Sequence, residues 1–499
     1  MRMIIEARIE DSTGASEPIR LAEFERADGD LKQLGLSLAE GRSLTYEAQR
    51  ALVNVQAQVF VVASRMCAQC GAALSIKAKH TIRYRTVFGK VSIESPQLRG
   101  GKCRPDTGSK SSSPLALAIP LRVSPELEYL QVKWAAHLPY AVATALLKET
   151  LPVDQAISTA GLRNRVWAVG QELDDKAESA IRGERAYPPA NSEYKIVALA
   201  VDSAWLRHRP SREEQDEAKL SQYFPSKRPP PTGRHVNIIA GPAVRDDGCC
   251  KVYGYVNREV TSAATRLDHF LSEQGAAPDQ KITIVSDGAG EFEKAVNGSK
   301  RPLTRILDWF HIAMKLRAIE QSALKFPDLL APNGRTVQDE IASAKWLTWH
   351  GKGSEAVERI ASAKWLTWHG KGSEAVERIR SIHDMLGVTP EHPAYSALWW
   401  NLRGTYWYLE SNDKYLVNYG WRYRRGMPIS SSIAESAVNE LVSLRCAKKR
   451  QMRWTNKGAH LLVQVRVAVL NGDLKMREIP EPRRTRAKQK PDDRCQRLA

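Results

Sequence analysis

Hydrophobic and polar positions recur along this chain with two different periods, and each period predicts a different kind of element. Residues 1–60 are expected to form a helical lead-in, with "SLTYEAQRALVNVQAQVFVVASRM" as its most periodic stretch. The segment "TIRYRTVFGKVSIE" then alternates with a period of two, which predicts a hairpin that turns at Gly89. Three helical segments follow, and the first opens with Ser124 as N-cap and Pro125 at the first helical position.

From Lys195 the pattern changes to short apolar runs separated by turn residues. The runs "KIVALAVDSAWL", "VNIIAGPAV" and "CKVYGYV" predict three strands, and "KITIVSDGAGEF" and "PLTRILDWFH" predict two more, each after a helix. This order combines hairpins with crossovers, so it predicts an α/β fold built on a mixed sheet. After His311 the pattern is helical again.

These patterns divide the chain into consecutive regions. They are a helical lead-in (1–60), a zinc-ribbon-like module (61–110), a helical DNA-binding region with helix-turn-helix-like spacing (111–190), the first part of an α/β core (191–320), a helical insertion (321–425), the last part of the core (426–475), and a basic tail expected to be disordered (476–499).

The helical insertion contains an exact tandem duplication. The segment "IASAKWLTWHGKGSEAVER" occupies residues 341–359 and again 360–378, and identity of this kind indicates a recent event rather than a solenoid. Because each copy carries a Gly-Lys-Gly break, the duplication predicts an added helix over residues 354–369, roughly 24 Å long at ~1.5 Å per residue. That helix either changes the end of the bundle from which the chain leaves, or the copy loops out without effect.

Composition narrows the class of protein. The 499 residues include 74 Lys+Arg against 56 Asp+Glu, a net charge of +18, and 42% are hydrophobic, so the chain can bury cores and is suited to neutralising phosphates. No apolar run approaches the ~18–20 residues of a membrane span, and the start "MRMIIEARIEDSTG" does not resemble a signal peptide. An odd number of scattered cysteines favours a reducing compartment, so we expect a cytoplasmic location at the bacterial nucleoid.

Three cysteines fall around the predicted hairpin. Cys67 and Cys70 have the spacing of a zinc knuckle and Cys103 closes the module, but a zinc ribbon needs four ligands. His80 is the candidate for the fourth. A bound Zn²⁺ and a metal-free hairpin therefore remain alternatives.

The third helical segment, "STAGLRNRVWAVGQEL", has the character of a recognition helix. Leu162 and Val166 begin an apolar face, and Arg163, Asn164 and Arg165 lie off it, where base or phosphate contacts are made in helix-turn-helix proteins. Packing within a plain helical bundle is the alternative.

Three acids fall at positions that can converge. Asp202 and Asp287 end the first and fourth predicted strands, and Glu435 begins a late helix. If the first and fourth strands are neighbours, the aspartates reach the same edge, and three carboxylates can hold two Mg²⁺ or Mn²⁺ ions about 3.5–4 Å apart. A strand end, a turn and a capping box that begins at Ser432 are the structural alternatives.

Several segments together resemble a known family. "VDSAW", "VSDGAGEF", "ILDWFHI", "ISSSIAESAVNELV" and "KKRQMRWTNKGAHLL" resemble transposases of bacterial insertion sequences, in the Kra group related to Mutator-like transposases. The resemblance implies an RNase-H-like fold with a helical insertion, a DDE triad at Asp202, Asp287 and Glu435, and a further signature at Asp308 and His311. It leaves open whether that last pair acts on the phosphate or caps a helix.

Basic and aromatic residues flank the third acid and are candidates for phosphate clamps and base stacking. They are Arg422, Arg424, Arg425, Lys448, Lys449, Arg450, Arg453 and Trp454.

The expected function is that of a DDE transposase working on double-stranded DNA as a homodimer or higher oligomer. It would bind terminal inverted repeats, cut at the element ends by two-metal chemistry and join the freed 3′ hydroxyl to target DNA. Two alternatives remain: an element copy disabled by its duplication that only binds DNA, and an RNase-H-like nuclease that cuts without joining.

Overall fold

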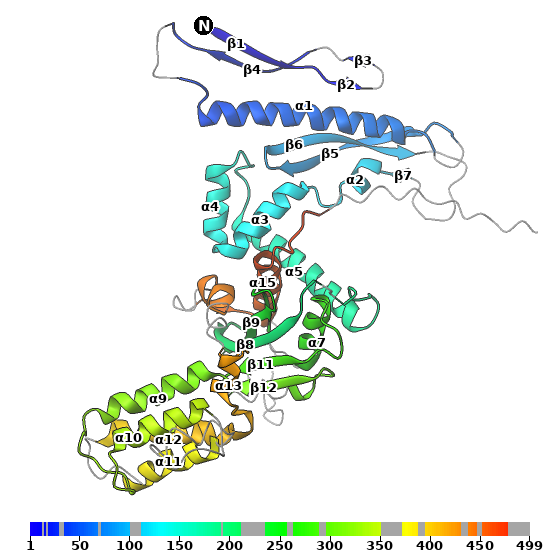
Figure 1. Ribbon diagram of the computed structural model, residues 1–499. Helices are drawn as coiled ribbons and strands as arrows, with labels where there is room; N and C mark the ends of the chain where they lie inside the picture. The colour runs from blue at the N-terminus through cyan, green and yellow to red at the C-terminus, as the bar shows by residue number, and fades with distance from the viewer. Residues whose placement is uncertain are drawn as a thin grey trace, which may run out of the picture. The chain divides into compact units, whose positions relative to one another are not determined.

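The computed structural model describes residues 1–11, 14–15, 18–28, 34–67, 71–99, 111–190, 193–210, 235–256, 263–288, 296–350, 372–387, 395–430, 438–446 and 452–477. The chain divides into two compact units (Figure 1). Unit 1 is Met1–Val166 with Leu474–Ala499, and unit 2 is Trp167–Asp473. None of the described helices has the length and apolar composition needed to cross a lipid bilayer.

Unit 1 opens with an antiparallel hairpin, which corrects the expectation of a helical start. Strand β1 (Arg2–Ala7) pairs with β4 (Ile19–Glu25), and β2 (Glu10–Asp11) pairs with β3 (Gly14–Ala15). The segment "IRLAEFE" alternates apolar and polar residues, and this period of two favours a strand. The helical part of the lead-in begins only at Leu38.

Helix α1 (Leu38–Ser64) follows, and its start is fixed by a capping box. The Glu40 amide donates to Ser37 Oγ at 3.2 Å, and the Ser37 amide donates back to the Glu40 carboxylate at 2.9 Å. These two bonds, together with burial of Val53 and Ala57, explain why the helix begins where it does and which face it packs inward.

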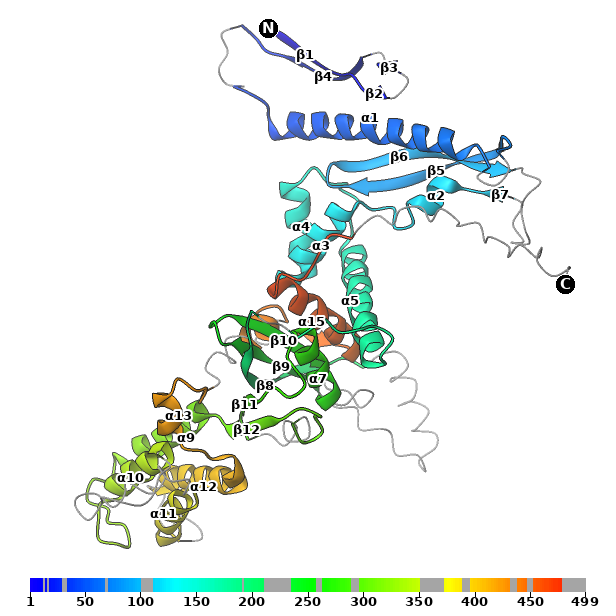
Figure 2. The same ribbon diagram turned by 45° about the vertical axis from the view of Figure 1, so that its right-hand side comes forward.

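The predicted β-hairpin after α1 is confirmed. Strands β5 (Ser75–Thr86) and β6 (Gly89–Arg99) pair antiparallel, and α1 lies along them in both views (Figure 1 and Figure 2). At the turn Gly89 has φ +116°, and a Cβ there would stand 2.7 Å from the Tyr46 ring, so only glycine fits. The short elements β7 (Ser111–Ser112) and α2 (Pro114–Ala118) complete this layer.

The three helices expected next are α3 (Pro125–His137), α4 (Tyr140–Thr150) and α5 (Thr159–Ile181). Ser124 caps α3 as predicted, because its side chain accepts from the Leu127 amide at 3.3 Å. Leu162 and Val166 of α5 are buried, which agrees with the expected apolar face.

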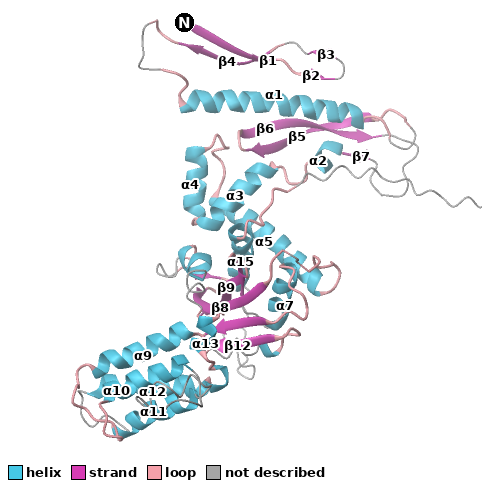
Figure 3. Ribbon diagram, in the orientation of Figure 1, coloured by secondary structure: helices cyan, strands magenta, loops and turns pink. Residues whose placement is uncertain are grey.

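Unit 2 contains a mixed sheet, whose strands are magenta in Figure 3, in the order β10-β9-β8-β11-β12 (labelled in Figure 2). Strand β13 pairs with one end of β8. The strands are β8 (Ile196–His208), β9 (His235–Arg245), β10 (Cys250–Val256), β11 (Ile282–Ser286), β12 (Leu303–Leu307) and β13 (Arg453–Trp454). Strands β11 and β12 run parallel to β8, whereas β9 and β8 are antiparallel, as are β10 and β9. The predicted α/β class and the adjacency of the first and fourth strands are confirmed.

Two details of this sheet differ from expectation. Strand β8 does not end at Asp202 but continues to His208, because Leu206 still pairs with Val236 of β9. Strand β13, from a segment expected to contact DNA, pairs parallel with the end of β8, with Trp454 opposite His208.

Helices surround this sheet and form the insertion. They are α7 (Ala263–Glu273), α9 (Trp309–Ala323), α10 (Val337–His350), α11 (Gly372–Met385), α12 (Ser396–Ser411), η2 (Asp413–Tyr415), α13 (Tyr419–Arg424), η3 (Asn439–Leu444) and α15 (Asn456–Leu470). Leu316, Ile341, Ile379 and Leu402 belong to one buried cluster that joins α9 to α12. The insertion is therefore a helical bundle with its own core.

The duplicated segments contribute unequal parts to this bundle. The described residues of the first copy are 341–350, in α10, and those of the second are 372–378, at the start of α11. Together they supply the opening helix and the closing helix of a single repeat. The added helix expected over 354–369 lies outside the described residues.

Candidate active site

Three aspartates stand side by side where the parallel strands of unit 2 stop pairing. Ser286 of β11 is in register with Val201 of β8 and with Leu307 of β12. Asp202 follows Val201, Asp287 follows Ser286 and Asp308 follows Leu307, so the three aspartates occupy corresponding positions on the three strands. Since neighbouring strands lie about 4.8 Å apart, these three residues form one row across three strands.

Asp308 is fully buried and its carboxylate has two roles. Oδ1 accepts from the Phe310 amide at 2.9 Å and caps α9, while Oδ2 lies 2.8 Å from Nδ1 of His311. A carboxylate can only accept, so Nδ1 carries the proton and Nε2 is the remaining ring nitrogen. Asp308 therefore caps a helix, which is one of the two alternatives that the sequence left open, and it also positions the imidazole of His311.

The three aspartates affect the pKa of His311. The hydrogen bond that Nδ1–H of His311 donates to Asp308 raises the pKa of the imidazole despite its partial burial, and the charges of Asp308, Asp287 and Asp202 act in the same direction. The imidazolium form is therefore favoured. The charges of both predicted metal-binding aspartates thus act on the histidine.

Two elements hold the loop that carries Asp287. Arg305 of β12 donates to Ser286 Oγ at 2.8 Å and to the Asp287 carbonyl at 2.9 Å. On the other side, a Cβ at Gly288 would lie 2.5 Å from Asn412 Nδ2 and 3.0 Å from the Tyr408 ring. Glycine thus lets the end of α12 approach the loop closely.

Burial also affects Tyr408. It raises the pKa of the phenol, and the charges of Asp287 and Asp308 raise it further, so the phenol stays neutral. Sequence reasoning did not select Arg305, Tyr408 or Asn412. A charged residue inside the apolar strand "LTRIL" was the one available signal.

The third predicted acid, Glu435, lies in 431–437, outside the described residues. The chain enters that segment next to the row, because the Trp309 amide donates to the Ile429 carbonyl at 3.0 Å. It leaves the segment at buried Val438, which precedes η3. Within the described part of the chain, no three His, Cys, Asp or Glu side chains form a metal-binding group.

The residues predicted to read DNA on α5 differ in exposure. Arg163 and Asn164 are exposed, with Arg163 donating to the Asn164 side chain at 3.3 Å. Arg165 is half-buried and pairs with Glu128 of α3 at 3.2 Å. The first two remain candidates for a surface contact, whereas Arg165 also joins two helices.

Around α13, the basic cluster separates into two kinds of residue. Arg424 and Arg425 are exposed, and the Arg425 guanidinium lies 4.0 Å from the Trp421 ring centroid. Arg422 is buried and donates to the Pro428 carbonyl and to Thr283 Oγ1, both at 3.0 Å. Its assignment to DNA is corrected, because its guanidinium is used in fixing α13 to β11.

The second basic cluster is only partly described. Arg453 is exposed, but Trp454 is buried in β13, so its ring is not placed to stack on a base. That expectation is wrong because the residue completes the sheet beside β8. Lys448, Lys449 and Arg450 lie outside the described residues.

The proposed zinc module is also partly outside the described residues. Cys67 is half-buried at a turn, where its carbonyl accepts from the Gly71 amide at 2.8 Å, while Cys70 and Cys103 fall in segments that are not described. His80 lies within β5 opposite Ser95, with Nε2 3.5 Å from Ser113 Oγ.

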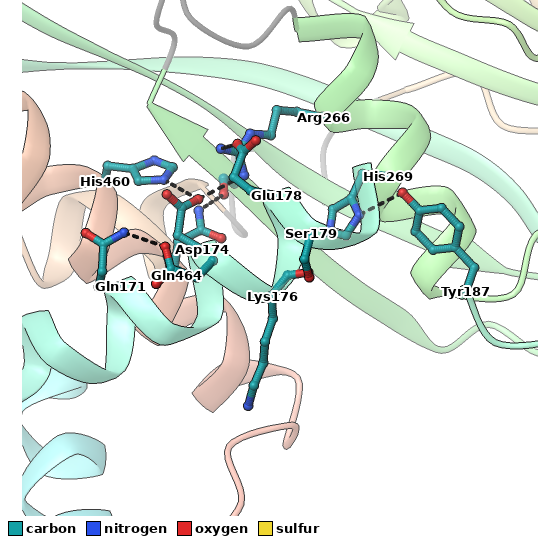
Figure 4. Close-up of polar contacts among 12 residues, drawn as sticks. Gln171, Asp174, Lys176, Glu178, Ser179, Tyr187, Arg266, His269, His460 and Gln464 are labelled. Atoms are coloured by element: carbon teal, nitrogen blue, oxygen red, sulfur yellow. Dashed lines mark hydrogen bonds and ion pairs between the residues drawn. The ribbon is translucent and has the colours of Figure 1, made fainter. Parts of the chain in front are cut away.

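A second polar cluster, not predicted, lies between α5, α7 and α15 (Figure 4). Asp174 accepts from His460 Nε2 at 2.8 Å and from Arg266 at 3.0 Å, and Arg266 also pairs with Glu178 at 2.5 Å. Burial opposes ionisation of Asp174, but the hydrogen bond and charge of His460 and the charge of Arg266 lower its pKa. The cluster fixes three helices to one another.

His269 stands at the edge of that cluster and is held neutral. Burial lowers the pKa of His269 to about 4, and the charges of Arg266 and Arg185 act in the same direction. Tyr187 lies 3.2 Å from its Nδ1. A neutral histidine beside an ion-pair network indicates packing rather than catalysis.

Comparison with known proteins adds no family assignment. No model of a known protein family matches the chain, and no curated protein matches it either.

Proposed function

We propose that this chain is a DDE-type transposase of an insertion sequence, with an RNase-H-like core in unit 2. The observation that carries the proposal is the row formed by Asp202, Asp287 and Asp308, together with His311, whose pKa these carboxylates raise. Clustered carboxylates at one edge of a mixed sheet support metal-dependent phosphodiester chemistry better than nucleophilic catalysis by serine or tyrosine.

The donor set suits a hard divalent cation. Carboxylate oxygens of Asp202 and Asp287, with Glu435 as third acid, would hold Mg²⁺ or Mn²⁺. When bound, such ions polarise a phosphodiester and lower the pKa of an attacking hydroxyl. Asp308 is not assigned as a ligand, because both its oxygens are engaged with α9 and His311.

The remaining residues would position the reacting groups. Asp308 fixes His311 so that Nε2 is the nitrogen that meets a substrate, and the raised pKa favours the cation that pairs with a phosphate. Arg305 and the Gly288 contact hold the backbone of Asp287 in place. Arg424 and Arg425 would contact the DNA backbone.

A cleavage and joining assay tests the proposal. Purified protein with Mg²⁺ or Mn²⁺ is expected to nick DNA carrying the element ends and to join the 3′ hydroxyl to a target duplex. Asp202→Asn should lower the nicking rate by about 100-fold or more, by analogy with loss of one transition-state contact. Asp279→Asn, at an exposed turn before β11, is the matched control and should cut normally.

The assay separates the alternatives. Nicking without joining would mean that the protein is a nuclease and not a transposase. End binding with no nicking in the parent protein or any variant would contradict catalysis and favour a DNA-binding protein.

A further inference from the structure

Trp205 is an exposed aromatic residue on a strand of the unit 2 sheet. It belongs to β8 and is 47% exposed, although its neighbours Ala204 and Leu206 are buried. A single exposed aromatic ring is common on protein surfaces, so its neighbours decide what it can bind. The sequence predicted base stacking by Trp454, which is buried, whereas Trp205 offers its ring to solvent.

Basic residues share the face of the sheet on which Trp205 lies. Arg207 follows two positions later on β8 and therefore points to the same side. His235 of β9 and Arg453 of β13 are both in register with Arg207, so their side chains lie on that side too. All three basic residues are exposed. We call Trp205, Arg207, His235 and Arg453 the basic platform.

Two arginines of the basic platform stand opposite each other. Arg207 and Arg453 are paired across β8 and β13, and like charges directly opposite one another destabilise a sheet. Within the part of the chain that the structure describes, neither guanidinium forms an ion pair with a carboxylate. The strands are nevertheless held together, because the Arg209 amide donates to the Trp454 carbonyl at 2.8 Å. A phosphate bound to both guanidinium groups would remove the repulsion, since arginine donates to phosphate oxygens in a bidentate geometry.

The basic platform continues the strand that carries Asp202. Trp205 lies three residues beyond this aspartate, about 10 Å along β8. Strand β9 pairs along one side of β8, while on the other side β11 pairs up to Val201 and β13 pairs from Arg207. On that second side, residues 202–206 have no strand partner among the described residues. The basic platform is therefore the next exposed group along β8 after the acid row.

The combination of an indole ring with two arginines identifies the kind of partner. A base stacks on a tryptophan only when the face of the base is uncovered, so the ring favours an unpaired nucleotide over duplex DNA. Residues two apart on a strand are about 7 Å apart, which lets a base meet Trp205 while a neighbouring phosphate meets Arg207. The carboxylates of an acidic peptide would match the arginines, but they offer no flat ring to stack on the indole.

We infer that the basic platform binds an unpaired DNA strand beside the acid row, with Trp205 stacked on a base and with Arg207 and Arg453 on phosphates. The identity of that strand rests on the proposed function: it is the strand that separates from its complement where the site cuts an element end. Binding itself needs neither metal nor cutting, so the platform and the proposed function can fail separately.

Affinity for single-stranded DNA in EDTA tests the platform. Fluorescence anisotropy compares binding of the full-length protein to a short labelled oligothymidine and to a labelled duplex of unrelated sequence. Trp205→Ala should weaken oligothymidine binding by about 10-fold, the loss expected for one stacked base, and leave duplex binding unchanged. Trp205→Phe keeps a ring and should retain most of the affinity. Trp400→Ala is the matched control and should bind like the parent, because Trp400 is 59% exposed on α12, outside the basic platform.

Salt dependence tests the arginine pair. Arg207→Ala with Arg453→Ala should reduce the slope of log affinity against log salt for the oligothymidine by about 1.4, roughly 0.7 for each phosphate contact on a single strand. A parent that does not bind the oligothymidine, or a loss in Trp205→Ala that is equal for duplex and single strand, would overturn the inference. Nicking by the parent with unchanged oligothymidine affinity in Trp205→Ala would overturn the platform alone. Weakened oligothymidine binding in Trp205→Ala, with a parent that never nicks, would support the platform and contradict the proposed function.

Discussion

Asp308 shows how one buried carboxylate can serve both the fold and the site. Its Oδ1 caps α9, a bond typically worth about 1 kcal/mol, and its Oδ2 orients His311. Leaving such a group buried without partners would cost more than either bond contributes. The strand end, the helix start and the imidazole are therefore positioned together.

The pKa of His311 reports on the acid row. Asp287→Asn removes a charge that raises this pKa, so the pKa should fall, and Asp279→Asn should not change it. The measurement is an NMR titration of the imidazole Cε1–H signal. An unchanged pKa in Asp287→Asn would mean that the two side chains are not neighbours.

The same residue makes stability depend on pH. Because the folded-state pKa of His311 lies above its ordinary value of 6.5, its stabilisation is fully present below pH 6.5 and is lost as the pH rises through the raised pKa. His311→Gln should therefore lower Tm more at pH 5.5 than at pH 9. An equal loss of Tm at both pH values would contradict a charged pair with Asp308.

At the level of elements, the two copies of the duplicated segment together provide the helices of a single repeat: the first copy contributes to α10 and the second to α11. Arg378, the last residue of the second copy, pairs at 3.2 Å with Glu340, which directly precedes the first copy. Residues 353–359 are identical to 372–378, so removing one copy puts Arg359 in the place of Arg378. Every buried side chain at the start of α11 has an equivalent in the first copy.

Deletion of Ile360–Arg378 should consequently leave the bundle intact. We expect Tm to change by no more than a few degrees, since no described buried contact loses its residue type, and shortening a connection changes loop entropy only slightly. Differential scanning calorimetry measures this directly. A Tm lower by ten degrees or more would show that the second copy has its own structural role.

Sequence periodicity predicted the elements whose pattern is local. The strands of unit 2, the hairpin at Gly89 and the cap at Ser124 follow from alternation and turn chemistry, and these predictions are confirmed. The row of aspartates needed only strand order. Strands β1 and β4 were not predicted. Their alternating runs are short, and the long helical pattern that follows them dominated the interpretation of residues 1–60.

Predictions that depended on tertiary burial were less successful. Arg422 and Trp454 stand in basic, aromatic segments typical of DNA contacts, yet both are buried. Composition cannot distinguish an arginine that binds phosphate from one whose guanidinium donates to oxygens within the protein. The contact of Tyr408 and Asn412 with Gly288 joins residues far apart in the chain, which no local pattern reveals.

For the whole molecule, the proposed DNA partner rests on the net charge of +18. Exposed Arg424 and Arg425 are candidates for phosphate contacts in unit 2. Replacing both by alanine should reduce the slope of log affinity against log salt by about 2, roughly 0.9 for each phosphate contact. Fluorescence anisotropy on end DNA measures the slope.

Arg317→Ala is the control for that experiment, because this side chain is 67% exposed but lies on α9 outside the basic cluster. For Arg317→Ala, the slope of log affinity against log salt should match that of the parent protein. If the double variant also matches the parent, the cluster around α13 does not contact DNA.

Binding of Mn²⁺, followed by the EPR signal of the free ion, tests the central claim most directly. The parent protein should bind the ion, and Asp202→Asn, Asp287→Asn and Glu435→Gln should each weaken binding by more than about 10-fold, while Asp279→Asn binds normally. Equal binding by all five proteins would contradict a metal site at this edge of the sheet. Loss in both aspartate variants but not in Glu435→Gln would contradict the assigned triad.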